Sequence, residues 1–385
     1  MRCLWIAGTF HPQTTGVPVY VDRLTTALAD HAQVAIVTSN GLSRPSDPRV
    51  RQYVVPDLTT PHSPREWARA AADLGSVING YAPDVVHLGS ACEAVYRGVV
   101  PDRIPTLATV HGNDLTAPWQ HTPGVDTRRW VVDGLNACDH LLAVSGHTAA
   151  LLERWDVRRP TTVVTAGCDL DVFRPRPGTR EETRLCYGLP LDRPVVLTVG
   201  RLVARKGHLV LAEALATLTE PVHWMVVGRG PETASLLAGL RRLRLTKRVH
   251  LVDAVARTEL ALLYTACDVF ALTPEVREMD GLLDSEGFGL VYLEAAACGA
   301  PVLASDGAGC REAVVAGGTG LLVDPGDVAA VAAALHRLLA DPAQSRQLGE
   351  AGCALVHAAG GWPRLARQAL EHYRALTPRE VALSI

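Results

Sequence analysis

The chain has 385 residues, of which 48% are hydrophobic and 20% charged, and its formal net charge is −3. This length is long for one domain and comfortable for two, and the small net charge argues against a nucleic-acid-binding protein. Only Lys206 and Lys247 are lysines among the 37 basic residues, and we interpret this arginine-rich composition as the product of a GC-rich genome.

Nine cysteines occur without any Cys-x-x-Cys spacing, mostly in apolar segments. We therefore expect reduced core thiols in a cytoplasmic protein. The apolar opening at residues 3–7 is too short for a signal peptide, and no apolar run reaches membrane-spanning length. We therefore expect no transmembrane segment, so that the chain could meet a lipid only at the membrane surface.

Short apolar runs alternate with longer helical patterns, which is typical of a parallel α/β sheet. In the first half, helices are predicted at residues 19–30 and 64–81. Strands are predicted at residues 3–7, 34–38, 85–88, 106–110, 140–144 and 162–164.

Residues 172–178 are rich in proline and arginine, and we place the linker there, between a first domain of residues 1–173 and a second of 174–362. A last helix is predicted within the C-terminal segment 363–385. Two doubly wound domains should each bind ligands at the carboxyl edge of their strands. Strands of the second domain are predicted at residues 195–199, 224–227, 249–251, 269–272, 301–304 and 320–323.

The strand predicted at 195–199 runs into Gly200 and Arg201, and Lys206 follows five residues later. Two cations at the carboxyl edge of a sheet can hold a diphosphate, Arg through forked hydrogen bonds and Lys as a point charge. The alternative is a basic surface turn. The presence of one of only two lysines at this position favours binding.

Glu286 and Glu294 stand eight positions apart and flank the segment 287–290 (GFGL). The glycines let the backbone approach a ligand closely, and eight residues bring the second carboxylate back to about the same helical face. The run after Gly289 reads as a buried helix whose N-terminus suits a phosphate. Two such carboxylates could hold the polyols on either side of a diphosphate, as in a nucleotide sugar. The spacing alone equally fits two solvated glutamates on an ordinary helix.

These segments, in this order, resemble the retaining glycosyltransferases of family 4, whose donor site carries an E-x7-E signature and a V-G-R-x-x-x-x-K-G motif. The resemblance spans nearly the whole chain and is densest from residue 195 to 323. The segment 280–299 is most similar to actinobacterial phosphatidylinositol mannosyltransferases, which use GDP-mannose. The resemblance implies an α/β GT-B fold, with two Rossmann-like domains facing a central cleft and a C-terminal helix that crosses back onto the first domain.

The resemblance also assigns residues in the first domain. In the loop 10–16 (FHPQTTG), Gly16 matches the second of the family's two glycines, whereas Thr15 departs from the first. His111 matches the family's histidine that reaches the donor sugar, although a lone histidine at a strand end is more often structural. Asp114 and His11 are assigned to the acceptor.

The implied reaction residues are His111, Arg201, Lys206 and Glu286. The implied donor-binding residues are Gly16, Arg201, Lys206, Glu286, Gly287, Phe288, Gly289, Leu290 and Glu294. No cofactor is implied, because the nucleotide sugar is itself a substrate. No metal is expected either, since no His/Asp cluster has ligand spacing.

We expect transfer of a hexose from a GDP-sugar by front-face substitution, with the leaving phosphate taking the acceptor proton. A small soluble acceptor, such as a secondary metabolite, is favoured because the first domain is slightly acidic and lacks lysine. A lipid acceptor used with GDP-mannose, or a UDP-sugar donor, are the alternatives. Proteins of other functional classes are further alternatives. An inactive nucleotide-sugar-binding protein should have lost one of the four charged donor residues, which are Arg201, Lys206, Glu286 and Glu294. A GT-B epimerase should lack their combination. A phosphorylase should need a lysine that holds pyridoxal phosphate, and Lys247 lies in a polar segment that is poorly suited to that role.

Overall fold

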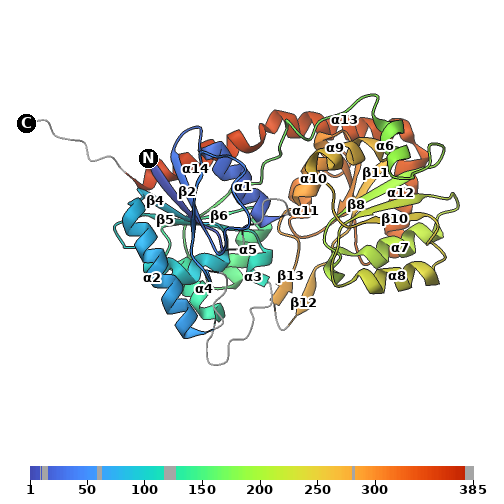
Figure 1. Cartoon of the computed structure of the whole chain (residues 1–385). Coiled ribbons are helices and arrows are strands. Elements are labelled where there is room, and N and C mark those ends of the chain that lie inside the picture. Colours follow the sequence, from blue (N-terminus) through green and yellow to red (C-terminus); the bar gives the residue numbers. More distant parts are fainter. Residues whose placement is uncertain (9, 11–15, 59–62, 117–126, 280–281, 378–385) are drawn as a thin grey trace, which may run out of the picture. The chain divides into compact units, whose positions relative to one another are not determined.

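The computed structural model describes residues 1–8, 10, 16–58, 63–116, 127–279 and 282–377 (Figure 1). It separates into two compact units. One consists of residues 1–166 and the C-terminal segment from residue 362, and the other of residues 167–361. Residues 167–173 belong to the second unit because Cys168 and Phe173 are buried in its core, so the boundary lies a few residues before the predicted linker.

The first unit is a parallel sheet of strand order β3-β2-β1-β4-β5-β6-β7. The order reverses between β1 and β4, which is the switch point where open α/β sheets bind ligands. The strands are β1 (Arg2–Ile6), β2 (Gln33–Thr38), β3 (Arg51–Val54), β4 (Val85–Leu88), β5 (Thr106–Val110), β6 (His140–Ala143) and β7 (Thr161–Val163). The helices are α1 (Val17–Leu28), α2 (Pro64–Tyr81), η1 (Ala91–Val99), α3 (Asn113–Thr116), α4 (Thr127–Asn136), α5 (Gly146–Arg154) and α14 (Gly361–Leu376).

The C-terminal helix α14 belongs to the first unit (Figure 1). A buried histidine ties it to the centre of that unit's sheet. The two ring nitrogens of His87 on β4 pair with the Tyr373 hydroxyl at 2.6 Å and the Thr109 hydroxyl at 2.7 Å. The ring also stacks on Trp5 of β1, with centroids 3.8 Å apart. Burial lowers the pKa of His87 to about 3, so a neutral imidazole links the helix to three strands.

The second unit is a parallel sheet of strand order β10-β9-β8-β11-β14-β15, with a separate antiparallel pair β12-β13. The strands are β8 (Val195–Val199), β9 (His223–Val227), β10 (Val249–Val252), β11 (Val269–Leu272), β12 (Arg277–Met279), β13 (Leu282–Asp284), β14 (Val302–Ser305) and β15 (Gly320–Val323). The helices are α6 (Arg180–Cys186), η2 (Ala204–Lys206), α7 (His208–Thr217), α8 (Thr233–Arg242), α9 (Arg257–Ala266), α10 (Leu290–Ala297), α11 (Cys310–Ala313), α12 (Val328–Ala340) and α13 (Pro342–Ala359).

Two hydrophobic clusters cover the two faces of this sheet. Val195, Leu197 and Val199 point into the cluster that includes residues of α9 and α10. Val196 points the other way, into the cluster that includes residues of α7, α8 and α12. A strand buried on both faces reads as a continuous apolar run, because successive side chains alternate between two apolar environments.

The predicted architecture of two doubly wound parallel sheets is confirmed. Two features were not predicted from the sequence. Strand β3 lies at the sheet edge with part-exposed and exposed side chains, and the β12-β13 pair consists of two three-residue strands. All nine cysteines are free thiols, and six of them are buried. Within the described ranges, no helix has the length and apolarity needed to cross a membrane.

Candidate active site

A buried cluster of charges lies at the carboxyl edge of the second unit's sheet. One oxygen of Glu286 accepts hydrogen bonds from Lys206 Nζ at 2.5 Å and from an Arg205 guanidinium nitrogen at 2.7 Å. Arg205 also contacts Asp284 at 2.9 Å. The loop after β8 is thereby joined to the segment before α10, eighty residues further along the chain.

Two opposing effects act on the pKa of Glu286. Burial alone would raise it, but the positive charges of Lys206 and Arg205 outweigh burial and hold it at about 2. Glu286 is therefore ionised at neutral pH. It can accept hydrogen bonds from hydroxyl groups and has no proton to donate.

Glycines permit the close backbone approach at this edge. Gly207, after Lys206, has φ +69°, and a Cβ there would lie 2.3 Å from the carbonyl oxygen of Thr273. Gly289 has φ +91° and immediately precedes α10. Arg201, in contrast, is exposed, and its side chain has no partner among the residues that the structure describes. The predicted pair of cations is therefore one half-buried lysine and one solvent-facing arginine.

Glu294 lies within α10 and is buried. Its two oxygens accept from Arg257 and from the Tyr264 hydroxyl, both at 3.3 Å. Burial raises the pKa of Glu294, and the Arg257 charge opposes that shift. Arg257 itself lies over the Phe173 ring at 4.8 Å. The second glutamate of the signature is thus held in one orientation by two residues of α9.

The segment between the two glutamates has a buried centre. Phe288 is buried, whereas Leu290, the first residue of α10, is half-buried. The backbone carbonyl of Glu286 accepts the N–H of Gly309 at 3.0 Å, and a Cβ on Gly309 would lie 1.9 Å from the carbonyl oxygen of Gly287. The tight packing fixes the turn that leads into α10.

The predicted residues of the first unit lie at the carboxyl edge of β5. One oxygen of Asp114 accepts the backbone N–H of His111 at 2.9 Å, and the other accepts that of Ala91 at 2.8 Å. The carboxylate is therefore committed to the backbone, which makes it a scaffold of the loop. This geometry favours a structural role over the predicted direct contact with an acceptor.

The His111 side chain is half-buried and fixed by its neighbours. Its Nε2 donates to the carbonyl of Gly89 at 3.0 Å, and its ring meets Tyr20 edge-on, with centroids 4.8 Å apart. Burial lowers the pKa of His111, so the neutral ring keeps its proton on Nε2 and leaves Nδ1 as an acceptor. Gly16, with φ +84°, is exposed and precedes α1. His11 lies outside the described residues.

Two buried residues near these sites were not predicted. Arg205 could have been noticed, because it stands beside Lys206 in the same basic turn. Glu93, on η1, gave no sequence signal. Its carboxylate accepts the backbone N–H of Gly8 at 2.9 Å and the Ser90 hydroxyl at 2.5 Å, and so it bridges the segments after β1 and β4 at the switch point.

Among the described residues, no three His, Cys, Asp or Glu side chains are grouped so that they could hold a metal ion. The charged groups described above at the carboxyl edge of the second unit are two cations around Glu286 and an arginine beside Glu294. Such an arrangement is suited to polyol hydroxyls and phosphate oxygens.

Comparison with known proteins identifies the family. The model described as Glycosyltransferase Family 4 matches residues 14–172, and that described as Glycosyl transferases group 1 matches residues 179–354. A GDP-mannose-dependent alpha-(1-6)-phosphatidylinositol monomannoside mannosyltransferase of Mycolicibacterium smegmatis is 33% identical over 289 residues, covering 73% of this chain and 74% of the relative. The chain belongs to glycosyltransferase family 4.

Solved structures agree with this assignment. Sucrose-phosphate synthase from Thermosynechococcus elongatus has a TM-score of 0.82 and 26% identity, covering 97% of this chain and 98% of that one. Anabaena HepE in complex with UDP and glucose has a TM-score of 0.81 at 20% identity, covering 97% of this chain and 100% of HepE. This family 4 chain has the GT-B fold, and it is a transferase that uses a nucleotide-sugar donor.

The buried Glu93 gives the stability of this glycosyltransferase a defined pH dependence. Burial raises the pKa of Glu93 from 4.5 to about 7. Between these values the unfolded chain is ionised while the folded chain keeps its proton, so rising pH favours unfolding. Relative to Glu93→Gln, the wild-type protein should therefore lose roughly 3 kcal/mol of unfolding free energy between pH 4.5 and 7.

Urea unfolding of both proteins across this pH range measures the difference. The glutamine keeps a carbonyl that can accept the Gly8 N–H, so the variant should fold. A stability difference that stays constant with pH would contradict the expected protonation of Glu93.

Proposed function

We propose that the protein is a retaining glycosyltransferase that moves a hexose from a GDP-sugar to a small soluble acceptor. The main support for donor binding is the ionised Glu286, which lies between Lys206 and Arg205 at the turn that leads into α10. Glu294 lies two helical turns further on, where a second polyol of the same donor would be reached.

Lys206 and Arg201 are proposed to hold the donor diphosphate. The free N–H groups at the start of α10 add a partial positive charge at the same place. These groups neutralise the leaving diphosphate without a metal ion or another cofactor, and stabilising that charge is the largest contribution the protein makes. In the free protein Lys206 donates a hydrogen bond to Glu286. On donor binding, Lys206 also interacts with the phosphate oxygens.

The two glutamates are proposed to hold the two sugars. Glu286, being ionised, accepts hydroxyl hydrogens of the hexose, together with the backbone of Gly287 to Gly289. Glu294, which Arg257 and Tyr264 hold in one orientation, accepts hydroxyl hydrogens of the ribose. In the first unit, His111, whose Nδ1 can accept a hydroxyl hydrogen, and Gly16 are proposed as ligand-binding residues.

Front-face substitution is supported by the state of the carboxylates. A nucleophile for a covalent intermediate needs a free oxygen beneath the sugar. Glu286 is instead paired with two cations, and Asp114 with two backbone N–H groups. In the proposed reaction the bond from the anomeric carbon to the diphosphate breaks, the acceptor oxygen or other nucleophilic atom bonds on the same side, and its proton goes to the leaving phosphate.

Removal of Lys206 tests the donor site without knowledge of the acceptor. We expect Lys206→Ala to weaken GDP binding by about ten- to hundredfold, because a charged hydrogen bond contributes roughly 1.5–3 kcal/mol. The matched control is Lys247→Ala, which removes the only other lysine and should leave GDP affinity unchanged. Calorimetric titration of the three proteins gives the result, and equal affinities for wild type and Lys206→Ala would refute the assignment.

The nucleotide preference forms a separate prediction. The GDP-mannose named for the mycobacterial relative supports GDP. We expect GDP to bind at least about tenfold more tightly than UDP, a difference of roughly 1.4 kcal/mol. The titrations should give the same values with EDTA as with Mg²⁺, since protein cations hold the diphosphate. Tighter UDP binding would overturn the GDP proposal, and a requirement for Mg²⁺ would overturn metal independence.

The soluble acceptor is supported by the environment of helix α2, the helix best placed by its sequence to dock on a membrane. Trp67 is half-buried and packs against the Tyr96 and Trp130 rings at centroid distances of 6.3 and 5.7 Å. Arg69 pairs with Asp57 at 2.6 Å. Both residues are thus engaged within the protein. The mycobacterial relative's phosphatidylinositol-containing substrate favours the second candidate, a lipid acceptor.

Vesicle binding separates these two acceptor classes. The full chain should stay in the supernatant when it is sedimented with anionic-lipid vesicles at physiological salt. Membrane attachment would need basic residues that each contribute about 1 kcal/mol at the surface. Co-sedimentation that is lost at high salt would reject the soluble acceptor and favour the lipid one.

A further inference from the structure

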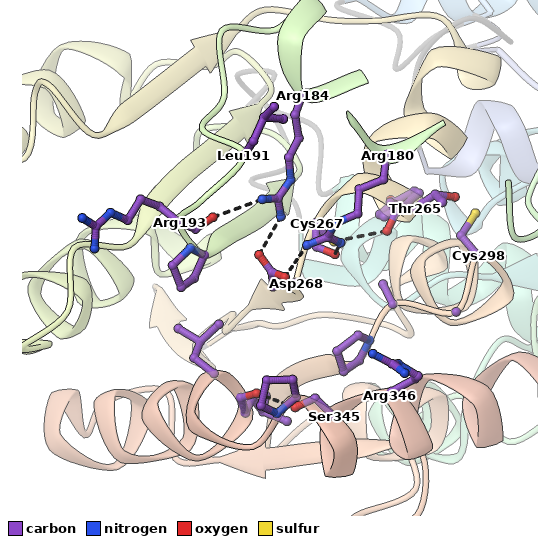
Figure 2. A pocket seen from close by; sticks show the side chains of 18 of the residues that line it. Arg180, Arg184, Leu191, Arg193, Thr265, Cys267, Asp268, Cys298, Ser345 and Arg346 are labelled. Carbon is purple, nitrogen blue, oxygen red and sulfur yellow. Dashed lines mark hydrogen bonds and ion pairs between the residues drawn. The ribbon is translucent and has the colours of Figure 1, made fainter. Parts of the chain in front are cut away.

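A cavity of about 630 Å³ opens at the amino-terminal edge of the second unit's sheet (Figure 2). Glu286 lies at the opposite, carboxyl edge. Its lining includes the residues just before β8, β11 and β14, among them Pro194, Asp268 and Pro301. The first residues of α6 and α13 and the ends of α9 and α10 complete the wall. Because parallel strands separate their two edges, the cavity is distinct from the proposed donor site.

One wall of the cavity is a fixed polar surface. Figure 2 shows Arg180 and Arg184 converging on Asp268, which they contact at 2.5 and 2.7 Å. Asp268 also accepts the backbone N–H of Val195 at 2.7 Å. Arg184 is almost fully buried and donates to backbone carbonyls, including that of Ala266. The single carboxylate is therefore more than neutralised by its neighbours.

The opposite wall supplies an uncommitted cation. Arg346 rises from α13, on the other side of the hollow from Arg180 and Arg184 (Figure 2). It is exposed, and no described residue pairs with its side chain. Arg193 extends away from the centre of the view and lies 3.7 Å from the exposed Asp192. The lining thus contains four arginines against two carboxylates, Asp192 and Asp268, and the excess charge there is positive.

We propose that this cavity binds a small organic molecule carrying a phosphate group and that the bound molecule alters nucleotide affinity at the donor edge. Arginine matches phosphate oxygens through forked hydrogen bonds. The volume lies within the roughly 300–1,000 Å³ typical of small-molecule sites and is much larger than an inorganic phosphate needs. Leu191, Leu338 and Leu339 offer an apolar surface for the organic part.

Two helices connect this cavity with the donor edge. Helix α9 begins at Arg257, which contacts Glu294, and its last turn includes Thr265, which lines the cavity. Helix α10 contains Glu294 and is followed by Cys298, which also lines it. A ligand that repositions the ends of these helices also acts on the pair that holds Glu294. This coupling rests on the proposed donor site, whereas ligand binding itself does not.

The binding test uses ribose 5-phosphate and inorganic phosphate as probes, titrated calorimetrically into the full chain. To exclude binding at the donor edge, the titrations are made in the Lys206→Ala background. We expect ribose 5-phosphate to bind more tightly than phosphate and Arg346→Glu to weaken it at least tenfold. Arg346→Glu should fold, because the side chain is exposed and no described residue pairs with it.

The matched control is Arg241→Glu, which reverses an exposed arginine on α8 of the same unit that does not line the cavity. It should leave probe affinity unchanged. If neither probe binds at millimolar concentration, or if Arg346→Glu binds as well as the control, the site is refuted. These outcomes do not depend on the donor assignment.

The coupling is read as the change in GDP affinity of the protein with an intact Lys206 when ribose 5-phosphate saturates the cavity. We expect at least a threefold change, in either direction, that disappears in Arg346→Glu. Thermodynamic linkage requires GDP to change ribose 5-phosphate affinity by the same factor. An unchanged GDP affinity with the cavity occupied would overturn the regulatory role.

Discussion

The pairing of Glu286 with Lys206 and Arg205 is the interaction on which the proposed donor site depends. A buried carboxylate is costly unless cations and hydrogen bonds compensate for the lost hydration, and here two cations do so at one oxygen. Loss of Lys206 would leave Glu286 paired with Arg205 alone, whereas loss of Glu286 would remove the carboxylate that Lys206 and Arg205 share. The same contacts hold the loop after β8 against the turn before α10. The same contacts therefore both neutralise the charge of Glu286 and set the shape of the proposed donor site.

The two units use the carboxyl edges of similar sheets in different ways. In the second unit this edge carries an ionised carboxylate and two cations beside a glycine turn. Such groups suit a diphosphate and its sugars. In the first unit, Asp114 and Glu93 are buried and turned to backbone N–H groups. Their function there is to fix the segments around the switch point. This asymmetry supports a donor held by the second unit and an acceptor received by the first.

The helices of the second unit extend this organisation to its opposite edge. Helices α9 and α10 present Arg257 and Glu294 near one edge and end in the wall of the cavity at the other. Their apolar faces are buried in a common cluster. Close-packed interiors transmit small displacements instead of absorbing them, which is the physical basis for relating a charged cavity to a distant site.

The sequence by itself determined the sheet architecture, and its E-x7-E spacing predicted Glu286 and Glu294 as donor-binding residues. Strands buried on both faces are visible as apolar runs, and β4, β5, β8, β11 and β15 have the predicted bounds. Helix α2 also has its predicted bounds, because Ser63 caps its start and the left-handed Ala82 ends it. The edge strand β3 was not visible, since exposed side chains leave no apolar pattern.

Only the tertiary structure decided which charges meet. Glu93 lies 85 residues from Gly8, and Glu294 lies 30 from Tyr264. No local pattern encodes such pairings, because they arise where the topology brings separate strand ends together. The structure also exposed Arg201 and turned Asp114 toward the backbone, although the sequence treats both as binding residues. Residue type and spacing report the chemistry available to a site, whereas burial and distance decide which atoms remain free to perform it.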